Sequence, residues 1–254
     1  MAKNGLLNSS APVAEFAKKH VIERQREEES GNAKTPRRDF LNRFKEARAK
    51  DPEFITEQLV LALTVANMFA GSDTTGITMR AVFYYLLRDP SKMDKLLDEL
   101  ARESKAGRFS REDGLAQWEE VGDLPYLSAV INEALRCHPA VGLTMERIVP
   151  PSGVKIAGHF LPGGTIAGCS AWVIHQDAEV FGSDAADFKP ERWIDATPEQ
   201  RRRMSNCLFS FGAGARTCIG KNISLLELYK LVPTILRRFE VSNPRNFNWV
   251  QSDI

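Results

Sequence analysis

Hydrophobic and polar residues along the first third of the chain recur mainly with a helical period. Charged amphipathic stretches at 14–29 and 39–47 predict two surface helices, joined by a polar linker at 30–36. An almost uncharged apolar run at 54–88 predicts one long central helix, which an Asp-Pro pair terminates. The pattern therefore indicates a helical framework around one long apolar helix.

The remainder of the chain mixes helices with a short region of strand character. Ser91 and Asp94 form a capping-box pattern that predicts the start of the next helix. Pro125, at a first helical position, predicts a further helix that runs to about Cys137. Short β-type runs at 154–174 surround the turn LPGG and predict a small sheet, and the chain after them is expected to be irregular up to a final helix. We find no internal repeat and expect one mainly α domain with a small β region over the whole chain.

Composition narrows the class of protein. With 254 residues, of which 43% are hydrophobic and 26% charged, the chain is long enough to bury a sizeable core. The formal net charge is +1 and no basic stripe is interleaved with aromatic residues, so nucleic-acid binding is not expected. The four cysteines show no CxxC pairing and the four histidines no zinc-ligand spacing, which argues against a disulfide framework or a zinc site. The opening MAKNGLLNSSAPVAEF lacks the apolar segment of a secretory signal, so we expect a protein on the cytosolic side of any membrane.

The long apolar run has two interpretations, because Asp73 is its only charged residue between Glu57 and Arg80. A run of roughly 20 apolar residues would suit a membrane span. Its second half, however, also contains asparagine, serine, threonine and glycine, and a carboxylate inside a bilayer is costly. We therefore predict a long helix buried inside a globular protein.

The stretch FSFGAGARTCIG gathers three glycines, an arginine and a cysteine ahead of an apolar helical pattern. A phosphate cradle would need glycines at the first, third and sixth places, but Thr217 occupies the last of these. The alternative is a metal bound by Cys218 at the predicted start of a helix, where unpaired N–H groups and the helix dipole favour the thiolate. Gly212 and Gly214 permit tight turns, and Gly220 leaves room for a flat ligand against the backbone. The spacing favours the metal.

Within the long helix, the motif AGSDTT places two small residues before an acid and two hydroxyls. Small side chains leave room against the helix for a diatomic ligand. A mid-helix threonine that bonds back to a carbonyl one turn earlier loosens the ladder and frees polar groups for a proton relay. The same residues also suit an ordinary kinked core helix, and the motif alone leaves both interpretations open.

Two further motifs carry opposite charges. In NEALRCHP, Glu133 and Arg136 stand three residues apart on one helical face, an arrangement that is most often a surface ion pair of little value to stability. In FKPERW, Arg192 lies in a stretch that is predicted to be irregular. If the fold brought this second arginine to Glu133, the three would form a charge network with a structural role.

Taken in order, AGSDTT, EALR, FKPERW and FGAGARTCIG resemble the motifs of the cytochrome P450 family of heme-thiolate monooxygenases, and in particular its eukaryotic microsomal-type members, fungal ones included. The order and the intervals of four motifs would rarely arise by chance. The resemblance covers nearly the whole chain and implies a P450 fold without its N-terminal half. The last motif matches the cofactor-binding loop of the family at Phe211, Gly214, Arg216, Cys218 and Gly220.

On the proximal side, the resemblance implies that Cys218 is the thiolate ligand of the iron of heme b, with Phe211 packed near the sulfur. Arg216 would pair with one heme propionate, and Arg147, in the sequence MER, would pair with the second. These roles define a metal ligand and its cofactor-binding surroundings.

On the oxygen side, the resemblance implies that Ala70 and Gly71 line the pocket. Asp73 and Thr74 would be the catalytic residues that deliver protons for the reduction of dioxygen. Four further residues match positions that often contact substrate and equally suit a simple apolar core: Phe69, Val141, Leu143 and Thr144.

The resemblance also implies a structural triad of Glu133, Arg136 and Arg192 that is buried and braces the heme loop. His175, in the sequence VIHQDAEVF, is expected to be structural as well, because Cys218 already supplies the axial ligand.

The reaction that the resemblance implies is the insertion of one oxygen atom from O2 into a small hydrophobic substrate of secondary metabolism, with electrons from an NADPH-dependent reductase. Complete members of the family are much longer, so a front half with a membrane anchor, a sheet and heme-covering helices is expected to be missing. Contact with the endoplasmic reticulum membrane would depend on that anchor. An alternative interpretation is a truncated, non-catalytic heme-binding or interaction remnant of such an enzyme.

Overall fold

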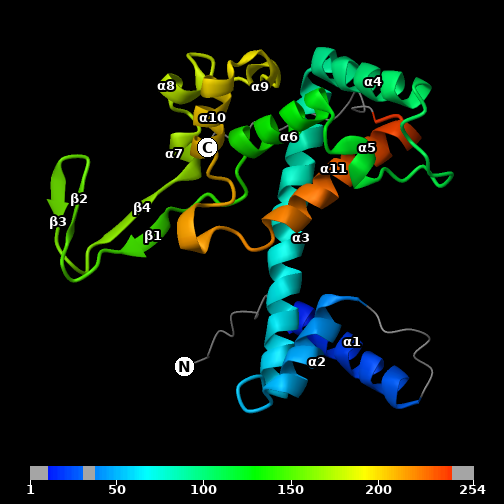
Figure 1. Cartoon of the computed structure of the whole chain (residues 1–254), viewed down its shortest axis with the longest axis vertical. Coiled ribbons are helices and arrows are strands. Elements are labelled where there is room, and N and C mark those ends of the chain that lie inside the picture. Colours follow the sequence, from blue (N-terminus) through cyan, green and yellow to red (C-terminus); the bar gives the residue numbers. More distant parts are fainter. Residues whose placement is uncertain (1–10, 31–37, 242–254) are drawn as a thin grey trace, which may run out of the picture. The chain divides into compact units, whose positions relative to one another are not determined.

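The structure is a computed structural model that describes residues 11–30 and 38–241 (Figure 1). Contacts within the chain define two compact units, Met1–Asp73 and Thr74–Ile254. The division between them falls inside the long helix α3 (Glu57–Arg88).

The first unit is helical and consists of α1 (Ala11–Glu29), α2 (Phe40–Lys50) and the first part of α3. The side chain of Asp39 caps α2 by accepting a hydrogen bond from the backbone N–H of Asn42 at 2.9 Å. Ion pairs join α1 to α2 and α2 to α3. The two predicted surface helices are confirmed, and the predicted linker at 30–36 lies, apart from its first residue, outside the described residues.

The apolar run forms a single α-helix, α3, as predicted. No helix in the described part of the chain is both long enough and apolar enough to cross a membrane. The predicted burial holds only for the second half of α3, which contains five of its buried residues: Thr75, Thr78, Ala81, Val82 and Leu86. For most of the first half the prediction is wrong, since Val60 is buried there but Ala62, Ala66 and Phe69 are exposed.

The main core of the second unit lies among the second half of α3, α4 (Pro90–Lys105), α5 (Trp118–Val121), α6 (Pro125–Cys137) and α11 (Lys221–Arg238). The longer helices contribute apolar residues at three- and four-residue spacings, which places them on one face, and α5 contributes Val121. Among the fully buried side chains are Val82, Leu86, Leu96, Leu127, Ile131, Leu228 and Val232.

The sequence patterns that predicted the N-termini of α4 and α6 are wrong in one case and right in the other. The capping box predicted at Ser91 and Asp94 is wrong, because Asp89 caps α4 by accepting from the backbone N–H of Ser91 at 3.1 Å. The helix from Pro125 is confirmed with both of its ends. The two backbone N–H groups that follow Pro125 donate to the buried carboxylate of Glu99 on α4, at 2.8 and 2.9 Å. Glu99 thereby satisfies donors that the helix itself leaves unpaired.

The β region consists of two antiparallel pairs rather than one sheet. Strand β1 (Met145–Ile148) pairs with β4 (Ile166–Cys169), and β2 (Val154–Ile156) pairs with β3 (His159–Leu161). Figure 1 shows the β2–β3 hairpin beyond one end of the β1–β4 ribbon. The prediction at 154–174 is therefore confirmed in part. It missed β1, whose last three residues are all exposed and show no alternation of burial.

Short helices occupy the segment between β4 and α11 that was expected to be irregular, so this expectation is wrong in part. The apolar Ala171–Ile174, predicted as strand, forms the helical turn α7. Thr197 and Gln200 form a capping box that starts the longest helix of this segment. The remaining elements are α8 (Ala178–Phe181), α9 (Glu191–Asp195), α10 (Pro198–Cys207) and the 3₁₀ turn η1 (Gly214–Arg216).

Candidate functional site

The cysteine loop, which we define as residues 209–220, closes on itself through backbone hydrogen bonds. The N–H of Cys218 donates to the carbonyl of Phe211, and the N–H of Gly212 donates to the carbonyl of Phe209, both at 2.8 Å. Gly212 and Gly214 have φ angles of 68° and 67°, a left-handed conformation that strongly favours glycine. The glycines predicted to permit tight turns do so here, and they fold the loop into a compact support for the cysteine.

Helix α11 begins at Lys221, with Gly220 as its N-cap residue. The prediction that Cys218 starts the helix is therefore wrong by three residues. The chain makes a further turn after the cysteine, in which the N–H of Lys221 donates to the carbonyl of Cys218 at 3.3 Å. A Cβ atom on Gly220 would lie 3.8 Å from the sulfur, so the glycine leaves the side of the thiol next to the helix open.

A cavity of about 640 Å³ opens beside the cysteine loop, within the second unit. This volume lies in the usual range for small-molecule and cofactor pockets. Apolar side chains from α6, β1 and α11 form much of its wall, among them Leu135, Met145, Ile148 and Leu228. Eight of the residues singled out from the sequence also line it: Thr74, Thr75, Val141, Arg147, Phe211, Gly212, Arg216 and Cys218.

The other residues singled out from the sequence lie elsewhere. Gly214 and Gly220 belong to the cysteine loop but are not among the described residues that line the cavity. Leu143 and Thr144, which precede β1, are not among those residues either. Four residues lie on α3 within the first unit, namely Phe69, Ala70, Gly71 and Asp73. Their roles toward a ligand stay predictions.

The charged groups of the cavity are mainly cationic. The guanidinium groups of Arg147 and Arg216 both line it, and both side chains are exposed. Arg147 also donates from Nη1 to the carbonyl of Glu146 at 2.7 Å, and the Glu146 side chain contributes to the wall. Two cations, one thiol and apolar walls suit an apolar ligand with anionic groups at its edge.

Of the hydroxyl side chains that line the cavity, sequence reasoning named Thr74 and Thr75 and missed Thr78, Ser210 and Ser224. Thr75 Oγ1 donates to Ser224 Oγ at 3.1 Å and so links α3 to the first turn of α11. Thr78 Oγ1 donates to the carbonyl of Thr74 at 3.0 Å, a mid-helix back-bond of the expected kind, but made by a threonine that follows the AGSDTT motif rather than by one within it. The spacing of Thr74, Thr75 and Thr78 places three hydroxyls on one face of the helix, and this signal was readable in the sequence.

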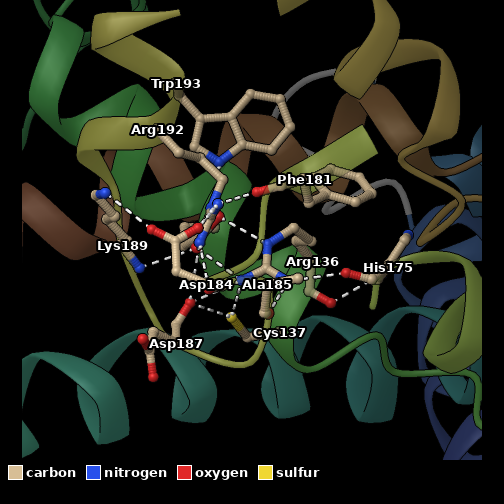
Figure 2. A network of polar contacts seen from close by, with 11 residues as sticks. Arg136, Cys137, His175, Phe181, Asp184, Ala185, Asp187, Lys189, Arg192 and Trp193 are labelled. Atoms are coloured by element: carbon tan, nitrogen blue, oxygen red, sulfur yellow. Dashed lines mark hydrogen bonds and ion pairs between the residues drawn. The ribbon is translucent and has the colours of Figure 1, made fainter. Parts of the chain in front are cut away.

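Glu133 on α6 is the centre of a buried polar network. Figure 2 shows the residues around it, among them Arg136, Arg192 and Trp193. Its Oε1 accepts hydrogen bonds from Arg136 Nη2 at 2.8 Å, Arg192 Nε at 2.9 Å and the backbone N–H of Lys189 at 2.9 Å. Its Oε2 accepts from Arg136 Nε at 2.9 Å and from Trp193 Nε1 at 2.8 Å. The structure thus brings Glu133, Arg136 and Arg192 together, and the first two side chains are 0% exposed rather than on the surface. The proposed bracing of the heme loop by these residues stays a prediction.

The two arginines also bind the backbone of the segment between α7 and α9. Arg136 Nη1 donates to the carbonyls of His175 and Ala185 at 2.9 and 2.6 Å, and Arg192 Nη2 donates to the carbonyl of Asp184 at 2.8 Å. Burial alone would lower the pKa of Arg136, but the hydrogen-bonded carboxylate of Glu133 outweighs it and the pKa is raised. Hydrogen bonds from Lys189 and Arg192 lower the pKa of Asp184 to about 2.

Of the four cysteines, all of which lie in the described residues, Cys218 is the one whose side chain lines the cavity. Cys137 is buried beside the Glu133 network, where Arg136 Nη2 lies 2.9 Å from its sulfur. Burial, with the charge of Glu133 as the next cause, raises the pKa of the Cys137 thiol to about 12. Cys137 is therefore protonated at neutral pH, which leaves Cys218 as the candidate metal ligand.

Comparison with known proteins shows which family this chain belongs to. The family model of cytochrome P450 matches residues 7–249, and the chain is a member of the cytochrome P450 family. A cytochrome P450 monooxygenase of Aspergillus terreus is 48% identical over 236 residues, which are 92% of this chain and 47% of the relative. The cytochrome P450 monooxygenase cicH of Emericella nidulans is 41% identical over 242 residues, 94% of this chain and 48% of the relative. The cytochrome P450 monooxygenase mpaDE of Penicillium roqueforti is 39% identical over 237 residues, 92% of this chain and 27% of the relative.

The family resemblance of the four motifs and the mainly α fold with a small β region are confirmed. The chain spans about half the length, or less, of these curated relatives. Membership of the family implies a heme-iron cofactor.

The residues of the cavity fit such a group. A thiol, two guanidinium groups and apolar walls are the donor set that an iron porphyrin with two carboxylates requires.

Proposed function

We propose that this chain is the heme-side core of a monooxygenase that inserts one oxygen atom from O2 into a small hydrophobic organic substrate. One observation carries the proposal: side chains from three separate segments line one cavity, namely Thr74 on α3, Arg147 on β1, and Arg216 and Cys218 on the cysteine loop. These are the residue types that a thiolate-bound heme and a proton donor require.

In this proposal Cys218 Sγ ligates the iron of heme b, and the guanidinium groups of Arg147 and Arg216 each pair with a heme carboxylate. Phe211 and Leu228 both belong to the apolar core and both line the cavity, so they would give the bound group apolar surroundings. Bound heme supplies the redox chemistry that activates dioxygen and oxidises a C–H bond.

The protein supplies protons and orientation. Thr74 Oγ1 donates a proton toward the oxygen side of the cavity, and the carboxyl group of Asp73 restores it. The hydroxyl of Thr78 donates a hydrogen bond to the backbone carbonyl of Thr74, in the same turn of α3 as the proposed proton donor Thr74 Oγ1. Ala70 and Gly71 leave space for the oxygen molecule because their side chains are small.

The electrons come from an NADPH-dependent reductase, as the resemblance to microsomal-type members implies. The same resemblance supports action on the cytosolic side of the endoplasmic reticulum membrane. The names of the fungal relatives support a monooxygenase, and a role in secondary metabolism follows from the resemblance as well.

The test is the absorption spectrum of the purified chain, reconstituted with heme, reduced and exposed to carbon monoxide. We expect a strongly red-shifted Soret band in the wild-type chain, its loss in Cys218→Ser, and its retention in Cys169→Ser, whose cysteine is exposed on β4. Absence of the band from all three proteins would overturn the proposal and leave a non-catalytic remnant as the better description. Retention of the band in Cys218→Ser would assign the ligand to another residue.

A further inference from the structure

His175 follows α7 and is fully buried, and both nitrogens of its ring have protein partners. Nδ1 lies 2.8 Å from the carbonyl oxygen of Arg136, the penultimate residue of α6 (Figure 2). Nε2 accepts a hydrogen bond from the backbone N–H of Phe209 at 2.8 Å. Phe209 is the first residue of the cysteine loop, so one imidazole ring joins the end of α6 to the start of that loop.

The chemistry of the two partners determines the state of the ring. A carbonyl oxygen can only accept a hydrogen bond, so Nδ1 carries the proton, whereas a backbone N–H can only donate, so Nε2 is unprotonated. His175 is therefore a neutral imidazole with a defined tautomer. A second proton on the ring would set a donor on Nε2 against the N–H of Phe209 and break the link to the loop.

The surroundings of His175 favour this neutral state. Burial lowers the pKa of His175 to about 4. The charged groups that act on the ring both belong to α6: Arg136 lowers this pKa further through its charge, and Glu133 raises it. The ring of Phe181 on α8 packs edge-on against the imidazole, with 6.0 Å between the ring centroids, and contributes no charge.

The same end of α6 holds the loop at a second point. The carbonyls of the last helical turn have no partner inside the helix. That of Leu135 accepts from Ser210 Oγ at 2.7 Å, while that of Arg136 is bound by His175. Arg136 also donates to the carbonyl of His175 from its side chain, so backbone and ring of His175 are both fixed by one residue of the Glu133 network.

We propose that His175 is a positioning residue, which transmits the fixed position of the Glu133 network to the cysteine loop by holding the backbone N–H of Phe209. Within the loop, the carbonyl of Phe209 accepts from the N–H of Gly212 and that of Phe211 accepts from the N–H of Cys218, so displacement at Phe209 reaches the sulfur through two hydrogen bonds. The inference deepens the proposed function, and only its consequence for heme rests on that function.

Two variants distinguish the two hydrogen bonds of the His175 ring, the one to the carbonyl of Arg136 and the one from the N–H of Phe209. In His175→Gln, the side-chain oxygen can reach the position of Nε2 and keep accepting from Phe209. In His175→Asn, the shorter amide can donate only near the position of Nδ1 and leaves the N–H of Phe209 without an acceptor. Hydrogen exchange, followed by mass spectrometry on the full chain without heme, measures the protection of peptides over residues 208–213.

We expect exchange in this segment to accelerate about tenfold or more in His175→Asn, because one buried hydrogen bond is lost, and to stay near the wild-type rate in His175→Gln. Peptides over α4 should exchange as in the wild type in both variants. Unchanged exchange at 208–213 in the asparagine variant, or equal acceleration over α4, would overturn the inference, since the histidine would then be dispensable or of general importance to the fold.

The spectrum of the heme-reconstituted, reduced, carbon monoxide-bound chain separates this inference from the proposed function. We expect the red-shifted band to lose intensity in favour of a shorter-wavelength Soret band in His175→Asn, and to recover in His175→Gln. If the exchange result holds but the wild-type chain shows no red-shifted band, the proposed function fails and the link stands. If the wild-type chain shows the band and the asparagine variant keeps both band and protection, the link fails and the function stands.

Discussion

Replacing Glu133 by glutamine exchanges one oxygen of the buried network for an NH2 group. We expect this small change to destabilise the fold strongly. The substitution keeps the shape of the side chain but removes its charge and turns one oxygen into an NH2 group. Oε1 accepts three hydrogen bonds and Oε2 accepts two, all from groups that can only donate. Whichever oxygen becomes nitrogen, at least two donors then face another donor.

The magnitude follows from burial and charge. Glu133 and Arg136 are 0% exposed and the Arg192 side chain 6%, so Glu133→Gln leaves two guanidinium groups away from water without their shared counter-charge. Breaking a buried ion pair by removing one partner costs about 3–5 kcal/mol. For a chain of this length that corresponds to a fall in melting temperature of about 6–20 °C.

Urea unfolding of the full chain, followed by far-UV circular dichroism, measures the free energy of unfolding from the midpoint and slope. The matched control is Glu179→Gln, the same chemical change in an ion pair with Arg203, where the Glu179 side chain is 88% exposed. This control should leave the midpoint unchanged within error, because exposed pairs contribute little. A loss below about 1 kcal/mol in Glu133→Gln would refute the reasoning, since the network would then be no more valuable than a surface pair.

Three further predictions concern the loop, the long helix and pH. Because burial lowers the pKa of His175 from 6.5 to about 4, the unfolded chain binds the proton more tightly than the folded one. The contribution of His175 to the free energy of unfolding should be complete above about pH 6.5 and should fall by about 3 kcal/mol as the pH drops to 4. Urea titrations at several pH values should show this pH dependence in the wild type and not in His175→Gln. Gly212→Ala should destabilise the fold by about 1–2 kcal/mol because Gly212 has a left-handed backbone. Gly76→Ala inside α3 should stabilise it by about 0.5–1 kcal/mol, because a Cβ there meets no atom of the described residues within 4 Å. Thermal melting compares the two variants, and a change of the same sign in both would contradict the backbone argument. Thr75→Val should cost about 1 kcal/mol by removing the hydrogen bond to Ser224, and a double-mutant cycle with Ser224→Ala that gave full additivity would deny the link.

The long helices and a candidate cysteine ligand could be proposed from sequence, because their signals are local. The helix of Pro125 to Cys137 is defined by its own periodicity and its first residue, and the candidate ligand Cys218 stands in a compact motif. Short elements such as β1 and α7 could not be predicted. Four residues are too few for a period to appear, and their partners decide their conformation.

The polar contacts of the site depend on partners far apart in the chain, and for that reason most of them escaped prediction. Glu133 meets Trp193 across 60 positions, His175 meets Phe209 across 34, and Thr75 meets Ser224 across 149. Two arginines near Glu133 could be expected from the family motifs. Neither the indole of Trp193 nor the imidazole of His175 carries a pattern that pairs it with its partner.

The five hydrogen bonds of Glu133 set a minimum length for an independently folding second unit. Three of their donors lie at 189–193, so a chain that ended before Lys189 would have to bury this carboxylate with Arg136 as its sole remaining donor. Helix α6 packs one side against α4 and α11 and carries Glu133 on another side. Because both sides belong to one helix, they lose contact with water together when the helix packs. Proteolytic or designed fragments of the second unit should therefore fold only when they include both α6 and α9, which makes this half of the protein indivisible over at least residues 125–193.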